Sequence, residues 1–179
     1  MVELRSDPYV LKPRSDIQET ELEFRKQLNV SWCKGVLFNV VAFKNSIAIV
    51  EYDALLWNDD SILFIEYKDS KTAYKNLTAK RVQKKNSLAR NIARGLGYPK
   101  YNFTIVVNGI EESTIKGNTP VISLKEVYEY IPDYNPTILE IEYISKLIRK
   151  YNQIKQNELT KEYVIADLEK LKSMIEQNI

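Results

Sequence analysis

The chain has 179 residues, a length that suits one domain with a sizeable core and a small helical extension. Hydrophobic residues make up 44% of it and glycine and proline are few, which argues against a disordered or fibrous protein. The sequence contains no histidine and a single cysteine, which excludes histidine-dependent hydrolase sites, Cys/His zinc sites and an internal disulfide.

Charge is distributed unevenly along the chain, although its formal net value is only +2. Residues 68–100 contain ten lysines and arginines against one acid, Asp69, so this block carries +9 and the remainder −7. Such a block is typical of a nucleic-acid contact. The charged, proline-containing start lacks an apolar signal core, and no apolar run reaches the ~18–20 residues that cross a bilayer. We therefore expect a cytoplasmic protein that does not enter a membrane.

The first expected element is a helix over residues 16–29, with Asp16 as its N-cap. Its apolar stripe contains Ile17, Phe24 and Leu28, and Glu21 lies within that stripe. A carboxylate in this position either reaches water at the edge of the stripe or is paired or bound to metal, because an uncompensated buried charge is costly.

Three strands are expected next, over residues 36–43, 47–57 and 62–67, each rich in β-branched, aromatic and aliphatic residues. Four turn-forming residues, 58–61, join the second to the third. A hairpin with a two- or four-residue loop places Trp57 opposite Ile62 and Asp53 opposite Glu66. Since side chains alternate along a strand, Asp53, Glu66 and Lys68 share one face.

Opposed strand residues hold their Cβ atoms roughly 4.5–5.5 Å apart, close enough for two carboxylates to share a divalent cation. A lysine on the same face could activate water or stabilise the charge of a phosphodiester transition state. The alternative is a solvated strand face on which Asp53, Glu66 and Lys68 have no common role.

A long helix ending near Leu96 should follow, capped by Asn76 or Thr78, after a polar loop over residues 69–75. It would act as a crossover to a buried strand over residues 103–107, parallel to the third strand. Residues 121–124 are expected to form a last edge strand, unless Ser123 instead caps a short helix.

The chain from Thr137 onward reads as two helices, the second capped by Thr160. The second carries a short heptad-like seam of Val164, Leu168, Leu171, Ile175 and Ile179. This seam packs either on the rest of the chain or on a second subunit, which makes a homodimer one expectation. We therefore divide the chain into a core over residues 1–134 and a C-terminal helical extension over residues 135–179.

Asp53, followed after twelve residues by Glu66-Tyr67-Lys68, resembles the motif of the PD-(D/E)XK nuclease superfamily. The phrase EYDALLW…ILFIEYK is similar to its nuclease-related and Holliday-junction-resolvase-like branches, with Tyr52 in place of the family's proline. The resemblance covers residues 16–107. It implies an α/β, restriction-endonuclease-like mixed sheet of four to five strands flanked by helices.

The resemblance further implies a Mg²⁺-dependent deoxyribonuclease, with Mn²⁺ able to substitute, that hydrolyses phosphodiester bonds in DNA, branched or junction DNA among them. Asp53, Glu66, the Tyr67 carbonyl and Glu21 would hold the metal, with Glu19 and Glu23 as second choices to Glu21. Lys68 would be the catalytic lysine. The alternative is a nucleic-acid-binding protein on the same scaffold that does not cut.

Six residues of the basic block are expected to contact DNA: Lys71, Lys75, Lys80, Arg81, Gln83 and Lys84. The charged members would grip phosphates, and Gln83 occupies a position where resolvase-like members often carry a polar residue that reaches the site. The sequence leaves open the form of the DNA substrate, its sequence preference and the polarity of cutting.

Overall fold

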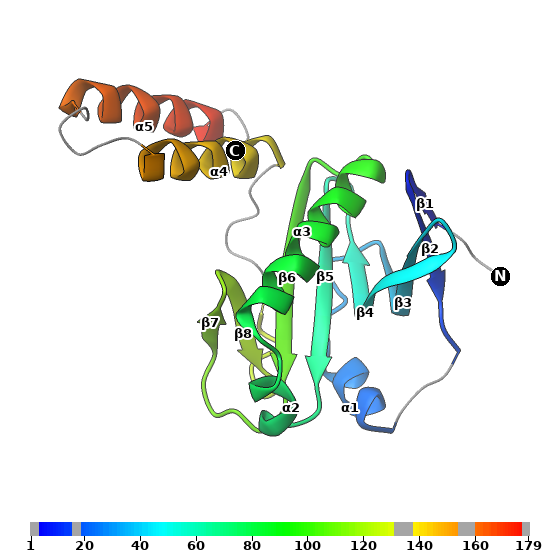
Figure 1. Ribbon diagram of the computed structural model, residues 1–179. Helices are drawn as coiled ribbons and strands as arrows, with labels where there is room; N and C mark the ends of the chain where they lie inside the picture. The colour runs from blue at the N-terminus through cyan, green and yellow to red at the C-terminus, as the bar shows by residue number, and fades with distance from the viewer. Residues whose placement is uncertain (1–3, 16–18, 131–137, 154–159, 177–179) are drawn as a thin grey trace. The chain divides into compact units, whose positions relative to one another are not determined.

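The computed structural model describes residues 4–15, 19–130, 138–153 and 160–176 (Figure 1). The chain divides into two compact units, Met1–Asn135 and Pro136–Ile179. The described residues form the mixed α/β fold class that the sequence predicts. Asp16, Ile17, Thr137 and Ile179, which the predictions used, lie outside the described residues.

Strands of the first unit build one mixed sheet, in the order β1-β2-β3-β4-β5-β6-β8-β7. Their bounds are β1 Leu4–Ser6, β2 Tyr9–Pro13, β3 Gly35–Lys44, β4 Ile47–Trp57, β5 Ser61–Lys68, β6 Lys100–Val107, β7 Thr114–Lys116 and β8 Thr119–Ser123. The prediction of four to five strands was wrong, because β1, β2 and β7 were missed. These strands are short, and charged, proline and turn-forming residues interrupt their apolar pattern.

The hairpin of β4 and β5 has the predicted register as far as Ala54 and Ile65, but the predicted pair of Asp53 with Glu66 is not part of the ladder. Trp57 pairs with Ile62, and the ladder continues through two further pairs to Ala54 and Ile65. The backbone N–H of Asn58 donates to the Ser61 carbonyl at 3.0 Å, which closes the two-residue loop, and Asn58 Oδ1 accepts the Ser61 N–H at 2.9 Å. The turn residues thus fix which side chains oppose one another.

Helix α3, Ala79–Gly95, connects β5 to the parallel strand β6, as the sequence predicts. Its N-cap is Thr78, whose hydroxyl oxygen accepts the backbone N–H of Arg81 at 3.3 Å. The predicted loop before it contains a short helix, α2, Lys71–Lys75. Strand β8 lies parallel to β6 but is not the edge, because β7 pairs with its outer side.

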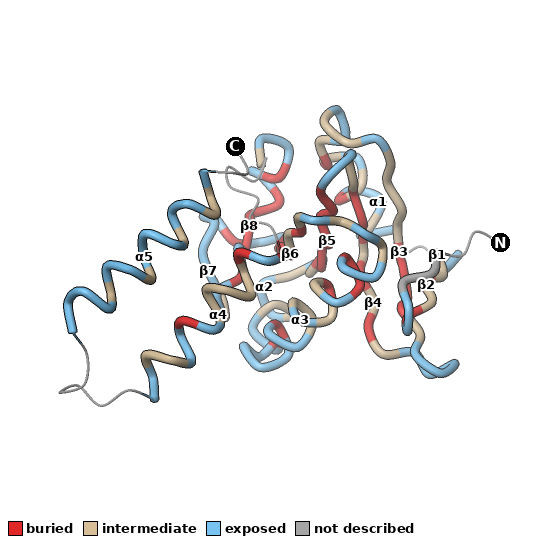
Figure 2. The backbone as a smooth tube through the Cα atoms, turned by 90° about the horizontal axis from the view of Figure 1, so that it is seen from above, coloured by how far each residue is buried: buried red, intermediate tan, exposed pale blue. Residues whose placement is uncertain are grey.

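Helices cover both faces of the sheet. Figure 2 shows α1, Glu19–Gln27, and α3 on opposite sides of β4 and β5. Phe24 of α1 is fully buried and stacks on the Tyr67 ring of β5, with ring centroids 4.6 Å apart. This contact anchors α1 beside the carboxyl end of β5, where Glu66 and Lys68 also lie.

The second unit contains helix α4, Ile138–Gln153, and helix α5, Lys161–Glu176. Asp167 of α5 joins them, since its carboxylate accepts hydrogen bonds from Lys150 Nζ and Tyr151 Oη, both at 2.6 Å. Thr160 caps α5 as predicted, accepting the Tyr163 N–H at 3.3 Å. No described residue of α5 is buried, and contact of its seam with a second subunit stays a prediction.

Among the helices of the described residues, none is both long and apolar enough to cross a membrane.

Candidate metal and nucleic-acid site

The site begins where the β4–β5 ladder ends. Beyond the Ala54–Ile65 pair, the Asp53 carboxylate takes the place of a backbone partner, and its Oδ2 accepts the Tyr67 N–H at 2.5 Å. The N–H and C=O of one strand residue point to the same side, so the Tyr67 carbonyl is also directed toward β4. A carboxylate and a carbonyl oxygen therefore share the gap between the strands.

An irregular residue of β3 borders the same gap. Asn39 falls between the paired residues Phe38 and Val40, opposite Asp53, and has a φ of 49°. A left-handed conformation inside a strand is uncommon for a residue other than glycine, and asparagine tolerates it better than most. The buried Asn39 side chain donates from Nδ2 to Glu21 Oε2 at 2.8 Å.

Helix α1 thus presents Glu21, and not its neighbouring acids, to the site. Arg25 also donates to Glu21, with an N–O distance of 3.3 Å, so that this carboxylate is partly neutralised. Glu23 instead accepts a hydrogen bond from Gln27, and Glu19 is exposed.

Glu66 lies between two lysines. Its Oε1 is 2.6 Å from Lys68 Nζ, and its Oε2 forms an ion pair with Lys85 of α3. Lys85 Nζ also donates to the Glu51 carbonyl at 2.9 Å. Because Glu66 is only 4% exposed, these two cations are what compensate its charge.

Lys85 is a site residue that the sequence-based prediction missed, since it counted there only as one of the ten lysines and arginines of residues 68–100. Its position in the helix could have identified it. Val82 and Ala89, three residues before and four after, are both fully buried, so Lys85 lies on the inward face.

These side chains surround a cavity of about 360 Å³, which we call the acidic cavity. Its lining includes five acids and three basic residues. All five residues predicted as catalytic or metal-binding line it, together with Lys85: Glu21, Asp53, Glu66, Tyr67, Lys68 and Lys85. The structure therefore brings together the residues that the hairpin register and the helix pattern singled out.

Burial and the nearby Glu66 charge raise the pKa of Asp53 from its ordinary value of 3.8 to about 7, against the lowering effect of the Tyr67 N–H and the lysines. For Lys68, burial alone would lower the pKa. The charge and hydrogen bond of Glu66 outweigh it and raise the pKa above the ordinary value. Lys68 is thus held as an ammonium, while the Asp53 carboxyl retains its proton to a higher pH than usual.

The donor set fits a hard divalent cation such as Mg²⁺. Asp53, Glu66 and the Tyr67 carbonyl supply oxygen atoms, and Mg²⁺ is usually bound by one or two carboxylates together with waters and phosphate oxygens. Burial is the larger cause of the raised pKa of Asp53 and the Glu66 charge the second, and a cation beside both carboxylates would offset their mutual repulsion. Within the described residues, no group of three or more cysteines and acids could hold a metal ion.

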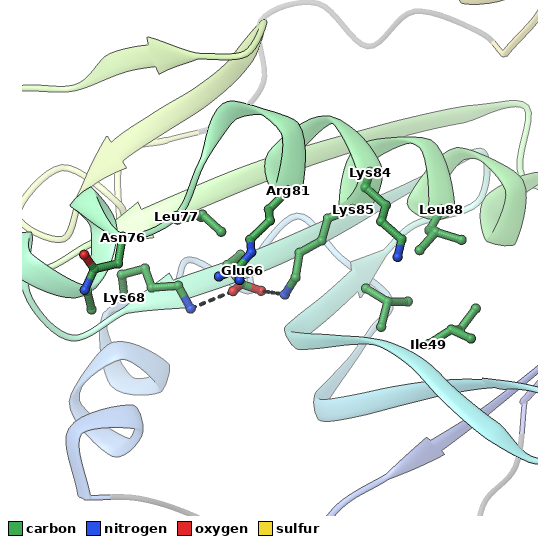
Figure 3. Close-up of a pocket in the computed structure, with 11 residues that line it drawn as sticks. Ile49, Glu66, Lys68, Asn76, Leu77, Arg81, Lys84, Lys85 and Leu88 are labelled. Carbon is green, nitrogen blue, oxygen red and sulfur yellow. Dashed lines mark hydrogen bonds and ion pairs between the residues drawn. The ribbon is translucent and has the colours of Figure 1, made fainter.

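The residues predicted to contact DNA lie on α2 and α3 and are exposed: Lys71, Lys75, Lys80, Arg81, Gln83 and Lys84. Arg81 and Lys84 line a second hollow of about 430 Å³, which we call the α3 groove (Figure 3). Gln83 does not line either hollow. Its side chain lies beside Gly117, at the β7–β8 turn.

Neither a scan against protein-family models nor a search of curated proteins found a match to this chain.

Proposed function

We propose that this protein is a Mg²⁺-dependent deoxyribonuclease that hydrolyses phosphodiester bonds in DNA, with branched DNA among its candidate substrates. The observation that supports the proposal is the convergence of Asp53, Glu66 and Lys68 on one cavity at the end of the β4–β5 ladder. An arrangement of two carboxylates and a lysine on a hairpin followed by a helical crossover also favours a sheet of the restriction-endonuclease-like type.

In this proposal Asp53, Glu66 and the Tyr67 carbonyl would hold the metal, and Glu21 would contribute through a water molecule, because the three acids do not form a group that could hold the ion directly. A bound Mg²⁺ ion supplies charge neutralisation and Lewis acidity at the phosphate. Lys68, which lies on the same face of β5 as Glu66, would reach the reacting phosphate from there. Its ammonium group stabilises the negative charge that develops in the transition state and orients the attacking water.

The DNA backbone would lie on the exposed surface of α2 and α3 and contact Lys71, Lys75, Lys80, Arg81 and Lys84. Gln83 would contact the DNA strand at the outer edge of that surface. These residues are exposed and lie on the two helices that follow the active-site strand. Because each phosphate contact releases counterions, binding should weaken steeply as salt is raised.

One observation favours the second candidate, a protein that binds nucleic acid without cutting it. Both carboxylate oxygens of Glu66 are engaged by lysines, Lys68 and Lys85. If these contacts persist in the presence of divalent cations, the carboxylate cannot serve as a metal ligand, and the basic surface remains as the functional part.

Cleavage of end-labelled branched, duplex and single-stranded DNA in Mg²⁺, Mn²⁺ or EDTA separates the two candidates. The variants to compare are Glu66→Gln and, as a matched control, Glu111→Gln, because Glu111 is an exposed acid outside both hollows. We expect metal-dependent cleavage that Glu66→Gln loses and Glu111→Gln retains. No cleavage by the wild type, with salt-sensitive DNA binding retained by both variants, would reject the nuclease and favour the binding protein.

A further inference from the structure

The α3 groove adjoins the acidic cavity and shares four lining residues with it, among them Glu66, Lys68 and Lys85. Figure 3 shows Lys68 and Lys85 pointing toward Glu66 from β5 and α3, with Ile49 and Leu88 at one end of the groove. Glu66 and Lys68, which we propose as metal ligand and catalytic lysine, therefore lie at the boundary between the acidic cavity and the α3 groove.

The second hollow combines apolar walls with a basic rim. Ile49 and Leu88 form part of the walls, and both are half-buried. Arg81 and Lys84 are exposed at its rim. With Lys68 and Lys85 the lining has four cations against one carboxylate, that of Glu66. A ligand that fits must be anionic at one end and flat or apolar at the other.

A nucleotide has both properties, since its phosphate suits the basic rim and its base suits aliphatic walls. The volume of about 430 Å³ lies near the lower end of the range for small-ligand sites, roughly 300–1,000 Å³, which favours one nucleotide over a base pair. A base inside a continuous duplex is stacked and paired, so it can enter such a hollow only when it is unpaired or extruded.

We propose that the α3 groove binds the base and sugar of one unpaired nucleotide adjacent to the phosphate at Glu66 and Lys68. This inference rests on the proposed nuclease function and narrows its substrate to DNA with an unpaired nucleotide beside the cleaved bond. Asn76, which lines the groove, presents an amide that can hydrogen-bond to the edge of the base.

The first test measures binding by the intact protein in EDTA, using fluorescence anisotropy with a labelled twelve-residue oligothymidylate. The comparison is an oligomer of the same length and charge in which every nucleotide is abasic. We expect the abasic oligomer to bind about tenfold more weakly, because the contacts between bases and the groove are lost while the phosphate contacts remain. Equal affinity for the two oligomers would overturn the inference.

Two variants then test whether the preference for the base-containing oligomer arises in the α3 groove. Ile49→Ser removes part of an apolar wall, and Leu88→Trp fills the hollow. Each should reduce the preference for the base-containing oligomer. Ile115→Ser is the matched control, because Ile115 is exposed on β7 and lines neither hollow. A preference that Leu88→Trp leaves intact would show that the bases bind elsewhere and would also overturn the inference.

Cleavage assays distinguish failure of this inference from failure of the proposed function. Metal-dependent cutting of fully paired DNA as efficiently as of single strands, with no effect of abasic positions, would reject the nucleotide site and leave the nuclease standing. Base-dependent binding that Leu88→Trp abolishes, without cleavage of any DNA in Mg²⁺ or Mn²⁺, would support the nucleotide site and reject the nuclease. Single-stranded and frayed-end substrates that are cut in preference to blunt duplex would support both.

Discussion

Replacing Asp53 with asparagine should stabilise the metal-free protein at neutral and alkaline pH. The Asp53 side chain is confined beside Glu66, and its pKa is raised from 3.8 to about 7. Between these values the folded state holds a proton that the unfolded state has released, so the free energy of unfolding falls as pH rises through this window. Asparagine keeps an oxygen to accept the Tyr67 N–H and has no charge to desolvate.

The size of the effect follows from the shift of about three pH units. At about 1.4 kcal/mol per unit, the upper limit is about 4 kcal/mol above pH 7. Asp53 retains partial contact with solvent, which screens the charge, so we expect about 2 kcal/mol. For a protein of this size that corresponds to an increase in Tm of about 4–8 °C.

Thermal unfolding in EDTA between pH 4 and pH 8 measures the difference between Asp53→Asn and the wild type. The difference should be small at pH 4, widen toward pH 7 and stay constant above it. Asp59→Asn is the matched control, since Asp59 is an exposed acid of the β4–β5 turn. Added Mg²⁺ should narrow the difference by stabilising only the wild type. A variant that is less stable than the wild type at pH 8, or a difference independent of pH, would show that Asp53 does not titrate with a raised pKa in the folded protein.

Three further substitutions test the contacts around the site by urea denaturation. Lys85→Met should lower the free energy of unfolding by about 2 kcal/mol, because the buried Glu66 loses one of its two cations. An unchanged urea midpoint would argue against this ion pair. Phe24→Ala should cost about 3–4 kcal/mol through loss of its stacking on Tyr67, whereas a cost below 1 kcal/mol would mean that α1 is not anchored there. Tyr52→Phe should cost about 1 kcal/mol, because the fully buried Tyr52 hydroxyl donates to the Lys85 carbonyl at 2.8 Å; no change would contradict that bond.

The hairpin could be predicted from sequence because its determinants are local. Asn58 and its neighbours fix the loop, and the apolar residues on either side fix the register, so the opposition of β4 and β5 follows from residues close in the chain. Glu21 could be singled out for a similar reason, as a charge within an apolar helical stripe.

Other parts of the site depend on contacts between distant residues. The spacing of Lys85 from Val82 and Ala89 indicates that it faces inward, but no pattern within the helix identifies Glu66 of β5 as the carboxylate that it pairs with. Asn39, which lies opposite Asp53 in the sheet, has a left-handed conformation that the strand pattern does not reveal. The edge strands β1 and β7 have three residues each, too few to show an alternation.

We propose that Lys68 acts on a phosphodiester beside Asp53 and Glu66, and the most direct measurement is the single-turnover cleavage rate of Lys68→Met in saturating Mg²⁺. Methionine retains the length of the side chain but has no charge. Lys125→Met, at an exposed lysine outside both hollows, is the control. We expect a rate lowered by about 10²–10³-fold in Lys68→Met, with DNA affinity and the cleavage rate of the control little changed. Cleavage by Lys68→Met at the wild-type rate would show that this lysine has no catalytic role.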